Sequence, residues 1–389
     1  MTYRILTLND ISPRGLARLP RERYEVGAAV ARPDAILLRS ADLHGFGVAP
    51  GVRAIGRAGA GVNNIPVAEM SRRGIPVFNT PGANANAVKE LVLAGLLLAA
   101  RNIGPAWLFA RALEGDDEAI EAAVEQGKKN FVGFELPGRA LGVVGLGAIG
   151  VEVANSALAL GMRVLGYDPQ LTVQRAWQLS SSVEQALSLE DLFTRADAIT
   201  VHVPLNEHTQ QLVNGARLAL AKPDATLLNF ARAAIVDTQA VLAALDAGRL
   251  HAYVCDFPSR ALKGHPRVVA LPHLGASTGE AEENCAVMVA EQVRDFLENG
   301  NIRNSVNYPE AVLPRVPNTT RLGVANSNVP NMVGQISTCL AARGINIADL
   351  LNKSRGEFAY TLIDADGAVG EDLLTSLRAI DGVLSARIV

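Results

Sequence analysis

The stretch Gly142-Val143-Val144-Gly145-Leu146-Gly147-Ala148-Ile149-Gly150 decides how this chain folds. The apolar, β-branched run at residues 141–144 predicts a buried strand, and it leads directly into glycines with the spacing G-x-G-x-x-G. A helical pattern follows at residues 151–160, and a second predicted strand at 162–167 ends at Asp168, about 20 positions past the glycines. This order of elements indicates a dinucleotide-binding βαβ unit.

Each glycine of the motif has a physical role in such a unit. Gly145 permits the tight turn, Gly147 lets the backbone approach a pyrophosphate, and Gly150 lets the helix pack closely against the strand. Without a bound nucleotide, the same residues would be a glycine-rich turn of an ordinary α/β domain, and that alternative stays open at this point.

The ends of the motif indicate which dinucleotide would bind. Ala148 and Ile149 begin the helix, where free N–H groups and the helix dipole favour an anion. Asp168 would accept hydrogen bonds from ribose hydroxyls and repel a 2′-phosphate, so the motif predicts NAD rather than NADP.

Composition narrows the class of protein. A length of 389 residues, of which 49% are hydrophobic, predicts two or three domains with sizeable cores. A net charge of −3 argues against nucleic acid as the main partner. The apolar run at 91–100 is too short to span a bilayer and predicts a core helix, so we expect no membrane association. Three widely spaced cysteines and no visible signal peptide favour a cytoplasmic protein, and no metal site is expected.

The first part of the chain alternates strand and helix patterns, with strands expected at 3–8, 35–39, 53–57 and 76–79. Ligands of parallel α/β sheets bind beyond the carboxyl ends of the strands. Arg39 with Ser40, and Arg57 with the loop Gly59-Ala60-Gly61, follow two such ends and are placed to hold an anion. The alternative is that both arginines are ordinary surface residues.

Further strands are expected at 198–203, 225–230, 252–256 and 268–270, and polar residues follow several of them. Arg232 offers a planar fork for a carboxylate. His273 follows an apolar strand and a proline, so with Arg232 and a nucleotide on the same sheet edge it is a candidate catalytic residue rather than a structural histidine. His202 is interpreted as a structural donor.

These motifs together resemble the D-isomer-specific 2-hydroxyacid dehydrogenases over roughly residues 1–310. The C-terminal segment, with Asn328-Val329-Pro330-Asn331-Met332-Val333 and Gly344-Ile345-Asn346-Ile347, resembles an ACT domain. Its predicted order is βαββαβ, which is that of a ferredoxin-like sandwich. The fold expected is therefore α/β, with two Rossmann-like, doubly wound parallel-sheet lobes and a C-terminal ferredoxin-like α+β domain.

The resemblance implies reversible, NAD-dependent oxidation of a small phosphorylated D-2-hydroxy acid, 3-phosphoglycerate, to 3-phosphohydroxypyruvate in the serine biosynthetic route. Arg232 would bind the substrate carboxylate, His273 would exchange the hydroxyl proton, and Arg39 and Arg57 would hold the phosphate. The resemblance also places cofactor contacts on the loops after the strands, at Val203, Phe230, Ala231, Arg232, Asp256, His273 and Gly275.

One departure from the family pattern concerns the partner of His273. The family normally has a glutamate there, shortly after an Asp-Val-Phe sequence, whereas this chain reads Cys255-Asp256-Phe257-Pro258-Ser259-Arg260 with no Glu before His273. Asp256 is expected to hold the nicotinamide amide. The alternative is that it orients His273 and raises the pKa of its ring.

In the ACT-like segment the resemblance implies an L-serine effector at Asn326, Asn328 and Asn346, at an interface between two copies of the chain. Amide side chains can satisfy both ends of an amino acid, although these residues could equally serve only as caps of turns. A homo-oligomer, dimer or tetramer, is therefore expected.

The expected organisation is a discontinuous substrate-binding lobe (1–88 and 279–305), an NAD-binding domain (89–278), a linker (306–318) and the ACT-like regulatory domain (319–389). Two other functions stay open. One is the same chemistry on hydroxypyruvate or glyoxylate, and the other is an NAD-sensing regulatory protein that binds the cofactor without turnover.

Overall fold

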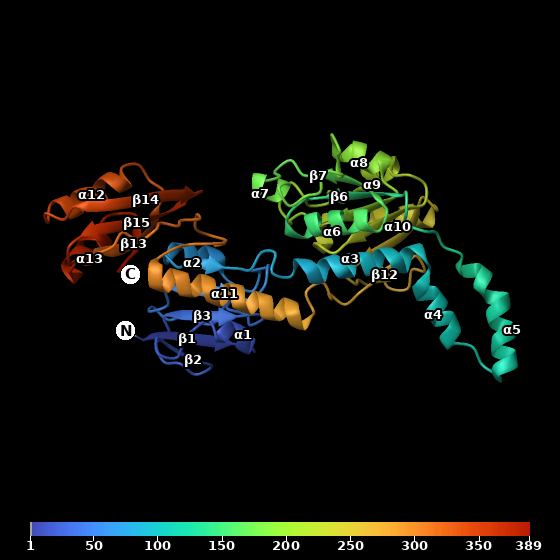
Figure 1. Cartoon of the computed structure of the whole chain (residues 1–389), viewed down its shortest axis with the longest axis horizontal. Coiled ribbons are helices and arrows are strands. Elements are labelled where there is room, and N and C mark those ends of the chain that lie inside the picture. Colours follow the sequence, from blue (N-terminus) through green and yellow to red (C-terminus); the bar gives the residue numbers. More distant parts are fainter. Residues whose placement is uncertain (1) are drawn as a thin grey trace. The chain divides into compact units, whose positions relative to one another are not determined.

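The computed structural model describes residues 2–389; Met1, where the predicted first lobe begins, lies outside them (Figure 1). The chain forms two compact units, unit 1 from residues 1–84 and 279–389, and unit 2 from residues 85–278. These boundaries lie close to the expected exchange of the chain between lobes at 88/89 and 278/279. The finer division into four parts stays a prediction.

Unit 1 begins with a parallel sheet whose strand order is β2-β1-β3-β4-β5. Its strands are β1 (Tyr3–Leu8), β2 (Tyr24–Gly27), β3 (Ala35–Leu38), β4 (Ala54–Arg57) and β5 (Val77–Phe78). The helices of this part are α1 (Pro13–Leu16), α2 (Val67–Arg72) and α11 (Gly279–Asn299). Helix α11 lies along the sheet, where Val289 and Val293 approach so close to Gly56 that a side chain at Gly56 would collide with them.

The C-terminal part of unit 1 is a four-stranded antiparallel sheet with the order β14-β15-β13-β16. Its elements are β13 (Thr319–Ser327), α12 (Met332–Ala341), β14 (Ile347–Arg355), β15 (Phe358–Asp366), α13 (Glu371–Arg378) and β16 (Val383–Ile388). Apolar residues of both helices, such as Ile336 and Leu377, pack with Leu322 and Ile363 of the sheet in one core. The predicted ferredoxin-like unit is confirmed.

The segment before this sheet, predicted as a linker, is packed rather than loose. Tyr308 is fully buried and donates a hydrogen bond to the Ser71 carbonyl, and the Asn307 side chain donates to Ser71 Oγ and the Ile75 carbonyl. Farther along, the carbonyls of Leu313 and Pro314 accept hydrogen bonds from a buried arginine of β13. The segment therefore ties the two sheets of unit 1 together.

That arginine, Arg321, forms a fully buried ion pair with Asp364 of β15. Its Nε donates to Asp364 Oδ1 at 2.7 Å and its Nη2 donates to Oδ2 at 2.6 Å. The Val316 N–H also donates to Oδ2. Because the bidentate pair satisfies both charged groups, removing either partner would leave a buried charge without compensation.

Unit 2 is built on a seven-stranded parallel sheet with the order β12-β11-β10-β9-β6-β7-β8. Its strands are β6 (Ala140–Val144), β7 (Arg163–Tyr167), β8 (Glu184–Gln185), β9 (Ala198–Val201), β10 (Ala225–Asn229), β11 (Leu250–Cys255) and β12 (Val268–Ala270). Strands on either side of β6 are reached in opposite directions along the sheet, as in doubly wound folds. The expected pair of parallel-sheet lobes is confirmed.

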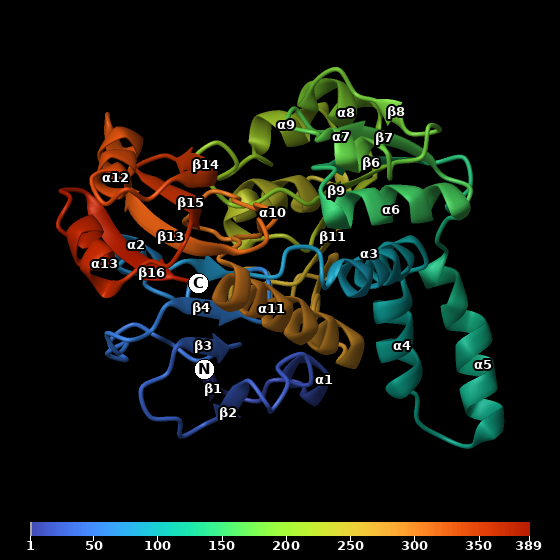
Figure 2. The ribbon, with the colours of Figure 1, turned by 60° about the vertical axis from the view of Figure 1, so that its left-hand side comes forward.

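The helices of unit 2 are α3 (Ala85–Ala100), α4 (Ile103–Arg111), α5 (Asp117–Gly127), α6 (Ala148–Ala159), α7 (Val173–Ala176), α8 (Leu189–Arg195), α9 (Gly215–Leu220) and α10 (Thr238–Asp246), with short 3₁₀ turns at Lys128–Phe131 and Ala233–Ile235. Helices α3 and α6 lie side by side, whereas α4 and α5 extend away from the rest of unit 2 (Figure 2).

Within residues 2–389, no single helix is long and apolar enough to cross a membrane; the bent pair α3 and α4, with 68° between them, passes the same test only when taken together. The same described residues contain no group of three His, Cys, Asp or Glu side chains that could hold a metal ion.

Several element boundaries differ from the expectation. Helix α6 begins at Ala148, inside the glycine motif, rather than at 151, and β13 continues to Ser327, into the predicted loop. The edge strands β2 and β8 were not predicted. Both are short and pair on one side only, so their residues do not show the continuous apolar run of a central strand.

Candidate active site

The glycine motif forms the turn between β6 and α6 in the conformation that its sequence predicts. Gly145 has φ = 90°, a left-handed conformation that residues with a Cβ rarely adopt, and its N–H donates to the Tyr167 carbonyl at 2.8 Å. A Cβ at this position would lie 2.9 Å from Val203 Cγ1 and 3.0 Å from the His202 carbonyl group. The turn therefore requires glycine for both conformation and space.

The other two glycines have different surroundings. A Cβ at Gly150 would lie 1.9 Å from the Gly145 carbonyl oxygen, so the first turn of α6 packs directly on the loop. A Cβ at Gly147, the residue before α6, would meet nothing within 4 Å. The backbone at Gly147 is therefore open to a ligand, and the first N–H groups of α6 can face a pyrophosphate. This cradle fits a dinucleotide.

Replacing Gly150 with Ala is expected to lower the midpoint of thermal unfolding by several degrees and to weaken NADH binding at least about tenfold, because the overlap with Gly145 must displace the helix or the loop. Gly147→Ala is the matched control. It should keep the parent's unfolding midpoint and lose only NADH affinity, measured by fluorescence titration. A Gly150→Ala protein as stable as the parent would contradict the close packing.

Asp168 lies at the carboxyl end of β7 and holds the loop from both sides. Its Oδ2 accepts the Leu146 N–H and its Oδ1 accepts the Gln170 N–H, each at 2.8 Å. Beside it lies a cavity of about 400 Å³ walled by apolar side chains that include Leu171 and Val183. A carboxylate next to an apolar cavity of this size suits the ribose and adenine of a nucleotide.

His202, after β9, has the environment of a structural residue. Its Nε2 lies 2.9 Å from Thr200 Oγ1, and burial lowers the pKa of the ring to about 3. The imidazole is therefore neutral at ordinary pH, and its role as a structural donor stays a prediction.

Arg232 follows β10 on a loop that the buried Asn229 holds. Asn229 Nδ2 donates to the Arg232 carbonyl at 2.9 Å, and Asn229 Oδ1 accepts the Ala231 N–H at 3.1 Å. Phe230 is buried between these positions, whereas the Arg232 side chain is exposed and its Nη1 donates to the Ala231 carbonyl. The guanidinium therefore keeps most of its N–H donors available for a ligand.

His273 stands on a strained loop after β12. Its φ is 57°, its side chain is exposed, and its ring meets that of Phe257 edge-on with 5.3 Å between the centroids. Left-handed backbone at a residue with a Cβ costs free energy and persists where the surroundings impose it, which occurs often at functional sites. Phe257 thus fixes one face of the imidazole.

Asp256, at the end of β11, holds this loop through its backbone. The carboxylate is almost fully buried; its Oδ1 accepts the Leu274 N–H and its Oδ2 accepts the Gly275 N–H, each at 2.7 Å. A Cβ at Gly275 would lie 3.2 Å from that second oxygen. Asp256 therefore positions the two residues that follow His273. Its direct contact with a nicotinamide or with the imidazole stays a prediction.

In unit 1 the structure brings Arg39 and Arg57 together beyond β3 and β4. Arg57 Nε donates to the Arg39 carbonyl at 3.0 Å, and a Cβ at Gly59 would lie only 2.2 Å from Arg57 Nη1. Arg39 Nη2 lies 2.7 Å from Glu282 Oε1 of α11. Gly59 thus makes room for the Arg57 guanidinium, and Glu282 is the present counter-ion of Arg39.

The remaining predicted anion residues lie on the same loops. The Ser40 N–H donates to Asn9 Oδ1, and the Ala60 carbonyl accepts a hydrogen bond from Asn79 Nδ2. Ala60 is exposed and Gly61 half-buried. These bonds fix the loop backbone, which leaves the arginine side chains as the groups suited to an anion.

The three asparagines predicted to bind an effector lie at opposite ends of the antiparallel sheet. Asn328 Nδ2 donates to the Gly356 carbonyl at one end, and Asn346 Nδ2 donates to Asp366 at the other. The buried Asn326 lies near the first end, and its Oδ1 accepts no hydrogen bond. One copy of the chain does not bring the three together, so a shared site needs two copies and stays a prediction.

Two site residues were missed from the sequence. Asn229 could have been noticed, because it is a polar residue that ends an otherwise apolar strand. The contact of Phe257 with His273 was not predicted, since it joins the loops before and after β12 and forms only when the chain folds.

The sequence matches one protein family and is similar to individual enzymes. Residues 99–275 match the family described as D-isomer specific 2-hydroxyacid dehydrogenase, NAD binding domain. A D-3-phosphoglycerate dehydrogenase of Haemophilus influenzae is 33% identical over 355 residues, which cover 88% of this chain and 82% of that protein. One of Synechocystis is 38% identical over 294 residues, covering 73% of this chain and 50% of that protein.

Among solved structures, the NAD⁺-bound 3-phosphoglycerate dehydrogenase of Entamoeba histolytica aligns with a TM-score of 0.62 at 24% identity. The alignment covers 79% of this chain and 99% of that one, and it supports the likeness of the fold.

Proposed function

This chain belongs to the D-isomer-specific 2-hydroxyacid dehydrogenase family and is an NAD-dependent dehydrogenase, and on that premise we propose that it interconverts D-3-phosphoglycerate and 3-phosphohydroxypyruvate. The observation that supports this substrate is the alignment with the Haemophilus influenzae D-3-phosphoglycerate dehydrogenase over 82% of that protein. The reaction is the first step of L-serine biosynthesis.

The proposed chemistry assigns roles to two exposed side chains of unit 2, Arg232 and His273. When bound, NAD supplies the hydride acceptor. Arg232 binds the substrate carboxylate with its planar fork and polarises the reacting C–O bond. His273 accepts the proton of the substrate hydroxyl in the oxidation and returns it in the reduction, because an imidazole can act both as a general base and as a general acid.

Arg39 and Arg57 are proposed to hold the phosphate of the substrate. Both follow parallel strands, and the glycine loop beside Arg57 leaves its guanidinium room to meet an oxyanion. The ion pair between Arg39 and Glu282 would have to break when the phosphate binds, because the same guanidinium nitrogen cannot form a short hydrogen bond to the carboxylate and to the phosphate at once.

The assay that tests the function is the oxidation of NADH with 3-phosphohydroxypyruvate, compared with hydroxypyruvate and glyoxylate. We expect kcat/KM to be highest for the phosphorylated substrate, and Arg57→Gln to raise its KM at least about tenfold while leaving KM for hydroxypyruvate nearly unchanged. Equal turnover of all three acids would favour a different D-2-hydroxyacid dehydrogenase. No turnover together with tight NADH binding would favour an NAD-sensing protein, which the missing glutamate also allows.

Asp256→Asn should lower kcat, because an amide cannot accept both loop N–H groups, so the residue after His273 loses its anchor. The pH profile of kcat/KM separates two roles of Asp256: a dyad with the His273 imidazole, and the positioning of the loop through its backbone N–H groups. A shift of the acidic limb to lower pH means that the carboxylate raises the pKa of His273. An unmoved limb with reduced kcat discards the dyad and leaves the positioning role.

The antiparallel unit is proposed to be an ACT-like regulatory domain that binds L-serine at Asn326, Asn328 and Asn346 between two copies. The unsatisfied, buried Oδ1 of Asn326 is the feature that supports a ligand there. We expect millimolar L-serine to inhibit turnover and Asn328→Ala to abolish the inhibition; full activity in L-serine would remove the effector from the proposal.

A homo-oligomer and a cytoplasmic location complete the proposal. Helix α4 is apolar yet buries none of its residues, and Trp107 and Leu108 are 57% and 62% exposed, which favours a partner over this helix. All three cysteines are free, which suits a reducing compartment. Analytical ultracentrifugation of the parent and of Trp107→Glu tests the oligomer.

A further inference from the structure

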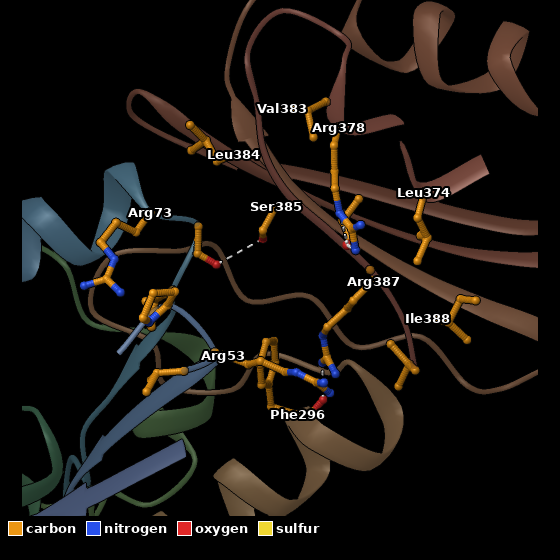
Figure 3. A pocket seen from close by; sticks show the side chains of 18 of the residues that line it. Arg53, Arg73, Phe296, Leu374, Arg378, Val383, Leu384, Ser385, Arg387 and Ile388 are labelled. Atoms are coloured by element: carbon orange, nitrogen blue, oxygen red, sulfur yellow. Dashed lines mark hydrogen bonds between the residues drawn. The ribbon is translucent and has the colours of Figure 1, made fainter. Parts of the chain in front are cut away.

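A cavity of about 760 Å³ in unit 1 lies between the parallel sheet and the antiparallel sheet (Figure 3). Arg53 and Arg73 line it from the side of the parallel sheet, and Arg378 and Arg387 line it from α13 and β16. None of these arginines belongs to the proposed substrate or serine sites. Four cationic side chains that line one cavity need an explanation.

The acidic side chains near this cavity are few and loosely engaged. Glu371 is the only acidic side chain in the lining described, and its closest approach to Arg378 is 3.6 Å. Asp34 lies 3.5 Å from Arg53, and Glu69 lies 3.5 Å from Arg73. Charge-assisted hydrogen bonds between guanidinium and carboxylate are about 2.7–2.9 Å long. These three arginines therefore lack a tightly bound counter-ion.

Arg387 is the most firmly held of the four. Its Nη2 donates to the Phe296 carbonyl at 2.5 Å and its Nη1 to the Leu297 carbonyl at 3.4 Å, while the guanidinium lies 4.2 Å above the Phe296 ring. No acidic side chain among the described residues pairs with it. Burial, and after it the nearby charge of Arg53, lower the pKa of Arg387. Its charge is therefore fixed in place beside a second cation.

The four side chains also have unused hydrogen-bond donors. A guanidinium carries five N–H groups, and the bonds described engage about three or fewer of them on each arginine. Figure 3 shows the guanidinium groups of Arg53 and Arg387 close together beside Phe296, and that of Arg378 turned toward the same space. An oxyanion between them would satisfy these donors and relieve the repulsion between the cations.

We propose that this cavity binds a small organic polyanion, one that bears phosphate or several carboxylate groups, between Arg53 and Arg387, with Arg73 and Arg378 at its ends. A volume of about 760 Å³ lies in the range of small-molecule sites and exceeds the needs of a single phosphate. The walls come from both sheets of unit 1, so the bound polyanion tightens the packing of the antiparallel unit on the parallel sheet.

The experiment is isothermal titration of the full chain with inorganic pyrophosphate and, separately, with citrate, at low ionic strength and without NAD or substrate. Arg53→Gln decides the result, because that side chain makes only one long ion pair and its loss should leave the fold intact. We expect it to weaken binding at least about tenfold. Arg387→Gln should do the same, although it also removes the two carbonyl contacts.

Two control variants accompany these measurements. Arg343→Gln removes an arginine of the same antiparallel unit that pairs with Asp372 outside the cavity, and it should bind as the parent does. Arg39→Gln removes the proposed phosphate site and should also leave binding at the cavity in place. Because no turnover is measured, the result is independent of the proposed enzymatic function.

The outcomes separate clearly. Binding of pyrophosphate alone identifies a phosphate ligand, and binding of citrate alone identifies a polycarboxylate. Binding of both identifies a general polyanion site. Each of these results supports the proposal. The proposal is overturned if neither anion binds at millimolar concentration. It is also overturned if Arg53→Gln binds as tightly as the parent, or if Arg39→Gln abolishes all binding.

Discussion

Replacing His273 with Gln is expected to lower kcat for the reduction of 3-phosphohydroxypyruvate roughly a thousandfold while changing the dissociation constant of NADH by less than about threefold. Glutamine keeps the approximate size and hydrogen-bonding capacity of the imidazole but cannot deliver a proton near neutral pH. Stopped-flow measurement of NADH oxidation, with fluorescence titration of NADH, separates the two quantities.

His208→Gln is the matched control, because His208 is highly exposed and belongs to a different loop of unit 2. It should behave as the parent in both measurements. A His273→Gln protein that keeps more than about a tenth of the parent's kcat would remove the proton-transfer role of this residue and require another acid in the site.

The second large effect concerns stability. Asp364→Asn is expected to reduce the free energy of unfolding of unit 1 by about 3–5 kcal/mol at pH 7, because it leaves the guanidinium of Arg321 buried with no charge to balance it. Thermal unfolding followed by circular dichroism should show the transition at a clearly lower temperature. Asp372→Asn, which breaks the exposed pair with Arg343, should shift it very little.

The effect of Asp364→Asn should depend on pH in a definite direction. Burial acts to raise the pKa of Asp364, but hydrogen bonds from Arg321 and the Val316 N–H outweigh it, so the pKa in the folded state is lowered. The stabilisation is therefore complete above the unfolded pKa of about 4 and is lost as pH falls through the folded value. The difference between parent and variant should shrink in acid; a constant difference down to pH 2 would contradict the ion-pair explanation.

Much of the fold follows from local patterns. The nucleotide loop was predictable because Gly145 and Gly150 each meet a steric requirement that no other residue fulfils, and because Gly147 leaves the backbone open to a ligand. The βαββαβ unit was predictable because apolar segments such as β13 and α12 are separated by turn residues such as Asn328 and Pro330. In both cases a short window of sequence contains the whole physical cause.

Other features depend on residues that are distant along the chain. Arg321 is a charged residue in a strand, and only its pairing with Asp364 on the neighbouring strand explains why it is fully buried. The hydrogen bonds from Leu274 and Gly275 to Asp256 likewise join two separate strand ends. Sequence patterns placed these residues at strand ends or within strands, but the contacts arise only when the sheets assemble.

The backbone of His273 has a consequence for the evolution of this protein. At φ = 57° a residue with a Cβ is less stable than glycine by roughly 1 kcal/mol, and asparagine tolerates the conformation better than most residues do. Selection for thermal stability alone would therefore favour glycine or asparagine at this position, and under the proposed mechanism the resulting protein would be more stable but inactive. If His273 transfers the proton as proposed, thermal stability and turnover oppose each other at this residue, so a search for stabilised variants has to measure both.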